Sequence, residues 1–346
     1  MTKSTRNSYL DVMKFLFSII IILYHFGFFF KGGYIVVEAF FMISGYFLMK
    51  SLKRSDDSLP LGEQTVRFVI HKYKAIVFFL IPSAIIGCIA YIFILPRDTE
   101  SVIMQATLML FEMIPLQTAG YSGFFATGVA WYLSALLISS MIVFPMAKKL
   151  KTTFSVWLAP LIAILGYGFL MTTFGNFDVP NSWILGLVNS GIIRALAGLS
   201  AGCFLYEISV RLEDKKPSAC ARVTLTVLEI VGWGYCVFVM NQYPRSIYDA
   251  AVVFIMFALL LIGINRYSYL TYLIQFPFTK HLATVSTIVY LNHYYWSQII
   301  VKKFPELPTE KSLPLYFGLI AASSVAVYIV GRILTYLVSK PKKKVS

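Results

Sequence analysis

The sequence has few charged residues and no organised set of cysteines. Only 13% of its 346 residues are charged, where a soluble protein has about 25%. The four Cys are scattered, without metal-ligand or CxxC spacing, so neither a metal site nor a redox motif is expected. The first apolar run has no small-residue cleavage site, and there is no internal repeat or Pro/Ser-rich linker. We therefore expect one membrane-embedded domain over residues 1–346, with no appended soluble domain.

Long apolar runs fill the chain instead. Hydrophobic residues make up 58% of the sequence, and the mean hydropathy is +0.74. Runs of about 20 apolar residues are typical of transmembrane helices. They predict an all-α polytopic membrane protein with about ten spans: 9–30, 34–50, 75–95, 129–147, 153–173, 183–205, 223–240, 248–264, 280–301 and 314–337. Residues 101–116 are too short and carry Glu112, which predicts a re-entrant or interfacial helix.

The net charge of +14 follows the topology of these spans. With the N-terminus inside, 21 of the 30 Lys and Arg residues fall in cytoplasmic segments and six in outer ones. This asymmetry follows the positive-inside rule. We expect a multi-pass protein of the plasma (inner) membrane with both termini cytoplasmic, including a basic tail at residues 339–346. The expected partner of the apolar surface is membrane lipid, and the charge does not indicate nucleic acid.

Lys14 and His25 lie eleven residues apart within the first span. At 3.6 residues per turn they share one helix face, together with Asp11 and Ser18. Ionisable residues are expensive in lipid and therefore indicate a functional site. The alternatives are that Lys14 extends to the membrane surface and that His25 is a packing histidine.

Glu38 lies near the outer end of the second span, at a depth similar to that of His25. A short turn joins the two helices, so we expect the carboxylate to approach the imidazole and to orient it. Alternatively, Glu38 is exposed at the membrane rim. Ser44 and Gly45, farther along the same span, are also consistent with close helix packing.

A cationic cluster precedes the third span. Arg67, His71 and Lys74 share one helix face, and Lys72 lies beside them. Such a cluster suits the phosphates of a nucleotide-containing cofactor. Anchoring to lipid headgroups is the simpler alternative.

Arg194 lies in the middle of a later span and requires a buried polar partner or a water-filled cavity. Gly198 and Gly202 follow at i+4 and i+8, which predicts a small-residue face for tight helix packing.

A second polar stripe occupies the span before the last. Ser286, Tyr290, His293 and Ser297 recur at i, i+4, i+7 and i+11. Its histidine lies toward the outer half of the membrane, as does His25. Two such histidines on different helices favour a functional role.

The order and spacing of these elements resemble the acyltransferase-3 family of integral membrane acyltransferases. The matching elements are Leu10-Asp11 with Lys14 and His25, Glu38 with Phe40-Phe41 and Ser44-Gly45, the basic patch before the third span, Trp131 with Leu133, Arg194 with Gly198, and Ser286 with Tyr290, Leu291 and His293. In the basic patch, His71, Lys72 and Lys74 stand where family members often have arginines. The resemblance covers nearly the whole chain.

The resemblance implies transfer of an acyl group, commonly acetyl, from a cytoplasmic acyl-CoA such as acetyl-CoA to a hydroxyl of an extracytoplasmic acceptor. The acceptor is expected to be a cell-envelope glycan or a lipid-linked saccharide. His25 would act as the base or as an acylated nucleophile, with Glu38 as its partner. The residues expected to bind the donor are Lys14, Arg67, His71, Lys72 and Lys74. The residues expected to line the pocket are Ser44, Tyr46, Trp131, Arg194, Tyr290 and His293.

Two other functions are consistent with the same polar residues. Charges near the bilayer midplane also occur along the substrate pathways of transporters and flippases. We find no paired inverted repeat or matching broken helices, which such transporters often have. A ligand-sensing membrane domain without catalysis is the third interpretation.

Overall fold

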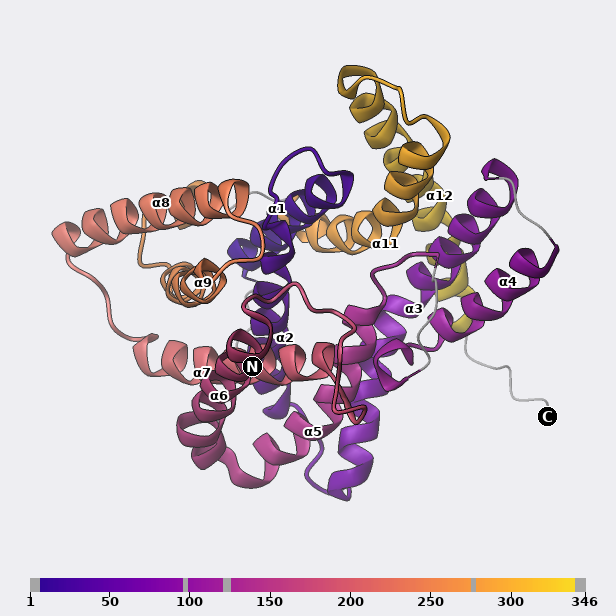
Figure 1. Cartoon of the computed structure of the whole chain (residues 1–346). Helices are drawn as coiled ribbons and strands as arrows, with labels where there is room; N and C mark the ends of the chain where they lie inside the picture. The colour runs from indigo at the N-terminus through magenta and orange to yellow at the C-terminus, as the bar shows by residue number, and fades with distance from the viewer. Residues whose placement is uncertain (1–6, 96–98, 121–125, 275–277, 340–346) are drawn as a thin grey trace.

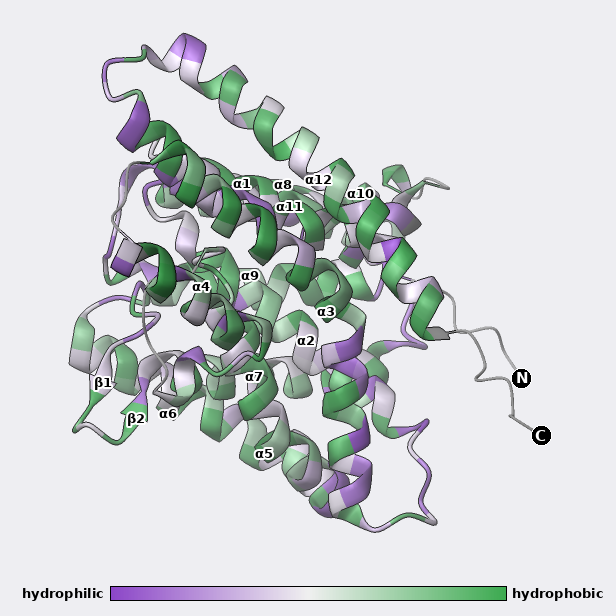
Figure 2. Ribbon diagram, turned by 90° about the vertical axis from the view of Figure 1, so that its right-hand side faces the viewer, coloured by the Kyte–Doolittle hydropathy of each residue, from purple (hydrophilic) through white to green (hydrophobic). Residues whose placement is uncertain are grey.

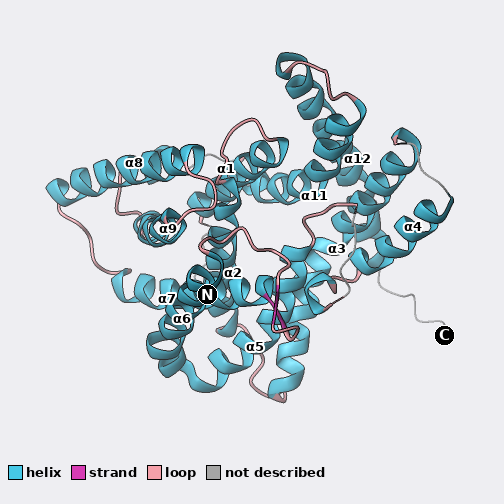
Figure 3. Ribbon diagram, in the orientation of Figure 1, coloured by secondary structure: helices cyan, strands magenta, loops and turns pink. Residues whose placement is uncertain are grey.

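Helices dominate the computed structural model, which describes residues 7–95, 99–120, 126–274 and 278–339 (Figure 3). The α-helices are α1 (Ser8–Phe26), α2 (Val36–Leu52), α3 (Leu61–Ile94), α4 (Thr99–Met113), α5 (Trp131–Thr153), α6 (Ala159–Phe174), α7 (Ser190–Leu212), α8 (Ala219–Gln242), α9 (Tyr248–Ile264), α10 (Leu270–Leu273), α11 (Thr279–Lys303) and α12 (Thr309–Ser339). Short 3-10 turns occupy Gly33–Ile35 and Gln117–Ala119, and a π-helical turn, Phe154–Leu158, joins α5 to α6. Residues 340–346 of the predicted basic tail lie outside the described residues.

The described helices confirm an all-α polytopic membrane protein. Seven stretches are long and apolar enough to cross a membrane, and one of them, Trp131–Phe174, contains both α5 and α6. Figure 2 shows hydrophobic residues along most helices and hydrophilic residues concentrated near several helix ends and loops. Each of the ten predicted spans overlaps a helix.

One predicted span begins too early. Residues 183–189 form a two-stranded antiparallel hairpin, β1 (Trp183–Ile184) with β2 (Val188–Asn189), and α7 begins only at Ser190. Leu185 and Gly186 both have positive φ angles (51° and 68°), which favour a tight hairpin turn. The side chain of Asn189 then accepts a hydrogen bond from the Gly191 amide and caps α7.

The predicted short helix before the fourth span is α4, which has 15 residues. Glu112 on this helix is fully buried, and its Oε1 accepts hydrogen bonds from the amide and the hydroxyl of Thr127. These contacts hold α4 against the loop that leads into α5. Its length agrees with a non-spanning helix, and its place relative to the membrane stays a prediction.

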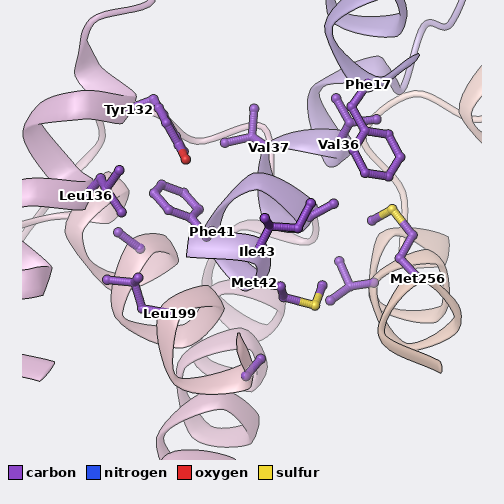
Figure 4. Close-up of a cluster of buried hydrophobic side chains, with 14 of the residues drawn as sticks. Phe17, Val36, Val37, Phe41, Met42, Ile43, Tyr132, Leu136, Leu199 and Met256 are labelled. Carbon is purple, nitrogen blue, oxygen red and sulfur yellow. The ribbon is translucent and has the colours of Figure 1, made fainter. Parts of the chain in front are cut away.

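The centre of the molecule is a tight contact between α2 and α7. A Cβ atom added to Gly45 would lie 2.0 Å from the Leu199 carbonyl oxygen, and one added to Gly202 would lie 2.0 Å from that of Met42. Glycine at both positions lets the two backbones approach closely, as small residues do in membrane proteins. The predicted small-residue face is therefore confirmed. Figure 4 shows side chains of α2 packed against this contact, with Leu199 on one side and Met256 of α9 on the other.

Candidate active site

The two predicted polar stripes face each other where α1 packs along α11 (Figure 1). Near the start of both helices, the Ser286 hydroxyl donates to the Lys14 carbonyl oxygen at 2.9 Å. Farther along, the His25 and His293 rings lie 5.1 Å apart between centroids, with 38° between their planes. His293 is fully buried and His25 is half-buried. The structure therefore brings together two histidines that lie far apart in the sequence.

The orientation of His293 is fixed by its own helix. Its Nδ1 lies 2.7 Å from the Tyr290 carbonyl oxygen. Because a carbonyl oxygen can only accept, Nδ1 must carry the hydrogen, and in the neutral ring Nε2 then carries a lone pair. Nε2 is buried and has no hydrogen-bond partner among the described residues. This nitrogen is thus a buried proton acceptor beside His25.

Aromatic rings surround His25 on two further sides. The Tyr24 ring lies 4.8 Å from it, and the Tyr294 ring lies 5.0 Å from it in an edge-to-face arrangement. Gly128, in the loop before α5, leaves room for Tyr294, because a Cβ there would lie 2.0 Å from the ring. Its φ angle of +63° also favours glycine. This loop therefore shapes the surroundings of His25.

Glu38 is not the partner of His25, and the predicted contact is wrong. Oε1 of Glu38 lies 2.7 Å from Nε of Arg194, and its Oε2 accepts a hydrogen bond from the Tyr167 hydroxyl at 2.8 Å. No hydrogen bond or ion pair joins Glu38 to His25 in the described part of the chain. Glu38 meets Arg194 because α2 packs closely against α7, where the guanidinium offers the carboxylate charge-assisted hydrogen bonds.

Arg194 has the buried polar partner that its position requires. Its guanidinium carbon also lies 5.1 Å from the centre of the Trp131 ring, in a cation–π contact. Arg194, Glu38 and Trp131 are all at least nine-tenths buried. We call Glu38, Trp131, Tyr167 and Arg194 the Arg194 cluster.

A cavity of about 330 Å³ contains several of the predicted site residues. Its lining comprises Lys14, Phe40, Ser44, His71, Lys72, Ala75, Ile76, Tyr132, Leu133, Leu136, Ser286, Thr287, Tyr290 and Leu291. We call it the lysine cavity. The Lys14 ammonium lies 4.7 Å from the centre of the Phe47 ring, and the hydroxyls of Ser44 and Tyr132 lie 3.3 Å apart. The cavity thus combines two lysines, several hydroxyls and an apolar wall.

Only part of the predicted cationic cluster lines this cavity. His71 and Lys72 do, whereas Arg67 and Lys74 are exposed and are not among its lining residues. Arg67 is 64% exposed and forms an ion pair with Glu63, four residues earlier on α3. The shared helix face therefore predicts the cavity position of His71 but not the exposed positions of Arg67 and Lys74.

Tyr290 connects the lysine cavity with the histidine pair. Its ring lines the cavity and lies 5.7 Å from the His293 ring, and its hydroxyl donates to the Val129 carbonyl oxygen at 3.3 Å. Sequence reasoning missed Tyr132, although it directly follows the predicted Trp131. It also missed Tyr167, for which the sequence carries no distinctive signal. Tyr46, which is also predicted to line the pocket, instead lines a different cavity together with Lys50 and Lys53.

A second cavity, of about 370 Å³, lies at the other end of α1. Its lining comprises Tyr24, Gly27, Phe29, Lys31, Pro244 and Arg245, and we call it the Arg245 cavity. Nε of Arg245 lies 2.9 Å from Oδ2 of Asp178, and this contact raises the pKa of Arg245. The Tyr24 hydroxyl donates to the same carboxylate oxygen. Since the Tyr24 ring also contacts His25, this cavity adjoins the histidine pair.

The fold and these contacts define a polytopic membrane protein with buried polar side chains inside its helix bundle. A family model described as an acyltransferase domain matches residues 7–332, nearly the whole chain. The chain therefore belongs to the acyltransferase-3 family and is a membrane acyltransferase. A search of curated proteins and a search of solved structures gave no match.

Proposed function

We propose that this membrane acyltransferase moves an acetyl group from acetyl-CoA, or the acyl group of another acyl-CoA, to a hydroxyl of an extracytoplasmic glycan or lipid-linked saccharide. The observation that carries the proposal is the placement of the His25–His293 pair. The lysine cavity includes Lys14, which precedes His25 on α1. The Arg245 cavity includes Gly27, which follows His25 just after the end of α1. The histidine pair thus lies between the two cavities along α1, and in this proposal the donor and the acceptor reach it from opposite ends.

The lysine cavity suits the donor. With the N-terminus cytoplasmic, Lys14 and Lys72 lie toward the side where acyl-CoA is made available. Ammonium groups form charge-assisted hydrogen bonds with phosphates, and the apolar wall suits the thioester arm of the donor. We assign Lys14, His71 and Lys72 to donor contacts within the cavity. Arg67 and Lys74, on the exposed face of α3, would contact phosphates outside it.

His25 has two possible chemical roles. As a general base, it takes the proton of the acceptor hydroxyl while the oxygen bonds to the thioester carbonyl carbon; the C–S bond breaks, and the CoA thiolate leaves and is protonated. As a nucleophile, its ring nitrogen displaces the CoA thiolate first, and the hydroxyl then attacks the acyl-imidazole. In both routes Nε2 of His293 is the neighbouring group that can exchange a proton with the site.

The other predicted residues surround this chemistry. Tyr290 and Ser44 would contact the donor, because both line the lysine cavity. Glu38 would act indirectly: it holds Arg194, which in turn packs on Trp131 at the start of α5. In this proposal Glu38, Trp131 and Arg194 are positioning residues.

The test is acyl transfer by the purified full chain in proteoliposomes. With labelled acetyl-CoA and cell-envelope glycans, we expect labelled acceptor and free CoA in equal amounts. His25→Gln should lower the rate at least about a hundredfold, the usual contribution of general acid–base catalysis. His281→Gln is the matched control, because His281 is an exposed histidine at the start of α11. This control should transfer at the wild-type rate.

Two results would contradict the proposal. Movement of the acceptor across the membrane without labelling would indicate a transporter. Labelling by His25→Gln at the wild-type rate would remove His25 from the chemistry. Acid quenching early in the reaction distinguishes the two routes, because only the nucleophilic route leaves label on the protein.

A further inference from the structure

A third cavity, of about 410 Å³, lies at the ends of α2, α7 and α9 and takes no part in the proposed transfer. Its lining comprises Asn7, Tyr46, Lys50, Lys53, Tyr206, Ser209, Val210, Glu213, Ile264, Asn265 and Arg266. We call it the basic cavity. Three cations line it against one carboxylate, that of Glu213. The positive-inside orientation places this cavity at the cytoplasmic face.

Arg266 occupies a backbone position that normally favours glycine. It follows Asn265, the C-cap of α9, and has a φ angle of +57°. At this position after a helix, the left-handed conformation is usually taken by glycine, because a Cβ atom is unfavourable there. The chain keeps this backbone conformation although the residue is an arginine with a long side chain. Here that side chain lines the basic cavity.

The walls of the basic cavity are tied together. The Asn7 side chain donates to the Ile264 carbonyl oxygen at 3.4 Å, which joins the start of α1 to the end of α9. The Tyr267 hydroxyl donates to the Leu212 carbonyl oxygen, which joins the next loop to the end of α7. These two hydrogen bonds therefore fix the helix ends that carry the cationic side chains of the cavity.

Lys53 is held in its charged form. Its ammonium lies 5.7 Å from the centre of the Tyr206 ring, and the Tyr206 hydroxyl raises the pKa of Lys53. Ammonium and guanidinium groups together with hydroxyl and amide donors form the usual surroundings of a phosphate. Basic pockets between transmembrane helices on the cytoplasmic side also bind phospholipid headgroups.

An apolar groove of about 260 Å³ lies farther along α7 and α9. Its lining comprises Met42, Pro160, Ala163, Ile164, Tyr167, Phe177, Ala201, Phe204, Ala250, Val253, Phe254 and Phe257. Ile164 is 69% exposed and Phe254 is 76% exposed, so the groove opens on the outer surface of the helix bundle. Tyr167 is the one polar side chain in this lining, and its hydroxyl is bonded to Glu38. The groove therefore suits a hydrocarbon chain.

The groove and the basic cavity lie along the same pair of packed helices. Phe204 of α7 stacks on Phe257 of α9 at 5.9 Å and lines the end of the groove nearer the basic cavity. Phe257 and Ile264, which lines the basic cavity, are seven residues apart, about 10 Å along a helix. An acyl chain of a membrane phospholipid is long enough to span this distance.

We propose that this pair of sites binds an anionic glycerophospholipid of the cytoplasmic leaflet. Its phosphate lies in the basic cavity, and one acyl chain runs along α7 and α9 into the apolar groove. A free phosphate compound would satisfy the cations but would leave the groove without a role. The two-part site therefore favours the lipid.

The test measures the thermal stability of the purified full chain while dioleoyl phosphatidylglycerol, whose acyl chains are long enough to reach the groove, is added. We expect saturable stabilisation, with dioleoyl phosphatidylcholine and glycerol 3-phosphate much weaker. Arg266→Gly should lower the affinity for phosphatidylglycerol at least about tenfold. Glycine suits this φ angle, so the variant should fold at least as well as the wild type. Lys151→Gly is the matched control: Lys151 is an exposed basic residue with a φ angle of 48° outside the cavity.

A second pair of variants tests the hydrocarbon half of the site. Ala250→Trp fills the groove and should weaken phosphatidylglycerol binding, whereas Ala251→Trp, at an exposed neighbour outside the lining, should not. Equal binding by Arg266→Gly and Lys151→Gly, checked with Lys50→Gln/Lys53→Gln, would overturn the headgroup site. If glycerol 3-phosphate binds as tightly as the lipid and Ala250→Trp has no effect, the lipid assignment is overturned in favour of a free phosphate.

Discussion

His293 illustrates how one backbone contact can fix which ring nitrogen carries the hydrogen. The Tyr290 carbonyl oxygen fixes the hydrogen on Nδ1, and burial leaves Nε2 without another hydrogen-bond partner among the described residues. A buried acceptor of this kind is unfavourable unless something else uses it. The nearby His25 ring and the acceptor hydroxyl of the proposed reaction are the groups that would use it.

Replacing His293 by phenylalanine should slow catalysis while an aromatic ring is kept at this position. We expect His293→Phe to lower the acyl-transfer rate at least about a hundredfold, because Nε2 is lost while the aromatic packing is retained. Tyr294→Phe, on the next residue and also against His25, should stay near the wild-type rate. Single-turnover release of CoA measures both. An active His293→Phe variant would show that His25 works without this partner.

Removing either charged member of the Arg194 cluster alone should destabilise the protein strongly. Removing one partner of a buried ion pair usually costs about 3–5 kcal/mol, because the other charge is left unpaired. We therefore expect Glu38→Ala and Arg194→Ala each to lower the free energy of unfolding by that amount. In contrast, the pair Glu63–Arg67 is 46% and 64% exposed, so its alanine variants should change the stability by about 1 kcal/mol or less.

Chemical denaturation in detergent micelles measures these variants. Replacing both partners, as in Glu38→Leu/Arg194→Met, should recover much of the loss, since no unpaired charge remains. Wild-type stability of the single variants would contradict the buried pair that the structure shows.

At the scale of helices, the contact between α2 and α7 depends on glycine. Gly202→Ala would place a Cβ 2.0 Å from the Met42 carbonyl oxygen, so the helices must separate. We expect a loss of about 1–3 kcal/mol in the free energy of unfolding. Gly168→Ala on α6 meets no atom within 4 Å and should instead stabilise the protein slightly, because alanine favours a helix. Equal effects of the two substitutions would contradict the tight contact.

The sequence predicts the positions of the helices far better than it predicts which helices pack against each other. Apolar runs placed every predicted span on a helix, and the periodicity correctly put Lys14 with His25 and Ser286 with His293. Periodicity gives the face of a helix but not the helix that it meets. For that reason the sequence predicts His25 as the partner of Glu38, whereas its partners Arg194 and Tyr167 lie more than a hundred residues away.

The same limit applies to the cavities. The lysine cavity collects residues from α1, α2, α3, α5 and α11, so no single stretch of sequence contains it. The hairpin at residues 183–189 was missed because its apolar side chains resemble the start of a span, while the turn depends on backbone angles at Leu185 and Gly186.

At the scale of the whole molecule, the orientation can be checked with a native cysteine. Cys220, at the start of α8, is exposed, whereas the other three Cys are buried. The distribution of Lys and Arg predicts that Cys220 faces the cytoplasm. A membrane-impermeant thiol reagent should therefore label it only after the cells are permeabilised. In a Cys220→Ser background, Leu185→Cys on the hairpin should be labelled in intact cells, because Leu185 is 90% exposed. Labelling of Cys220 in intact cells, with Leu185→Cys labelled only after permeabilisation, would show that the topology is the reverse of the predicted one.

The central claim is that His25 and His293 act as one catalytic unit, and a double-mutant cycle tests it most directly. The measurement is the single-turnover rate of acetyl transfer from labelled acetyl-CoA by the wild type, His25→Gln, His293→Gln and the double variant. We predict that each single substitution lowers the rate at least about a hundredfold and that the double variant is no slower than the slower single one. Losses that multiply in the double variant, or a single variant at the wild-type rate, would contradict the account.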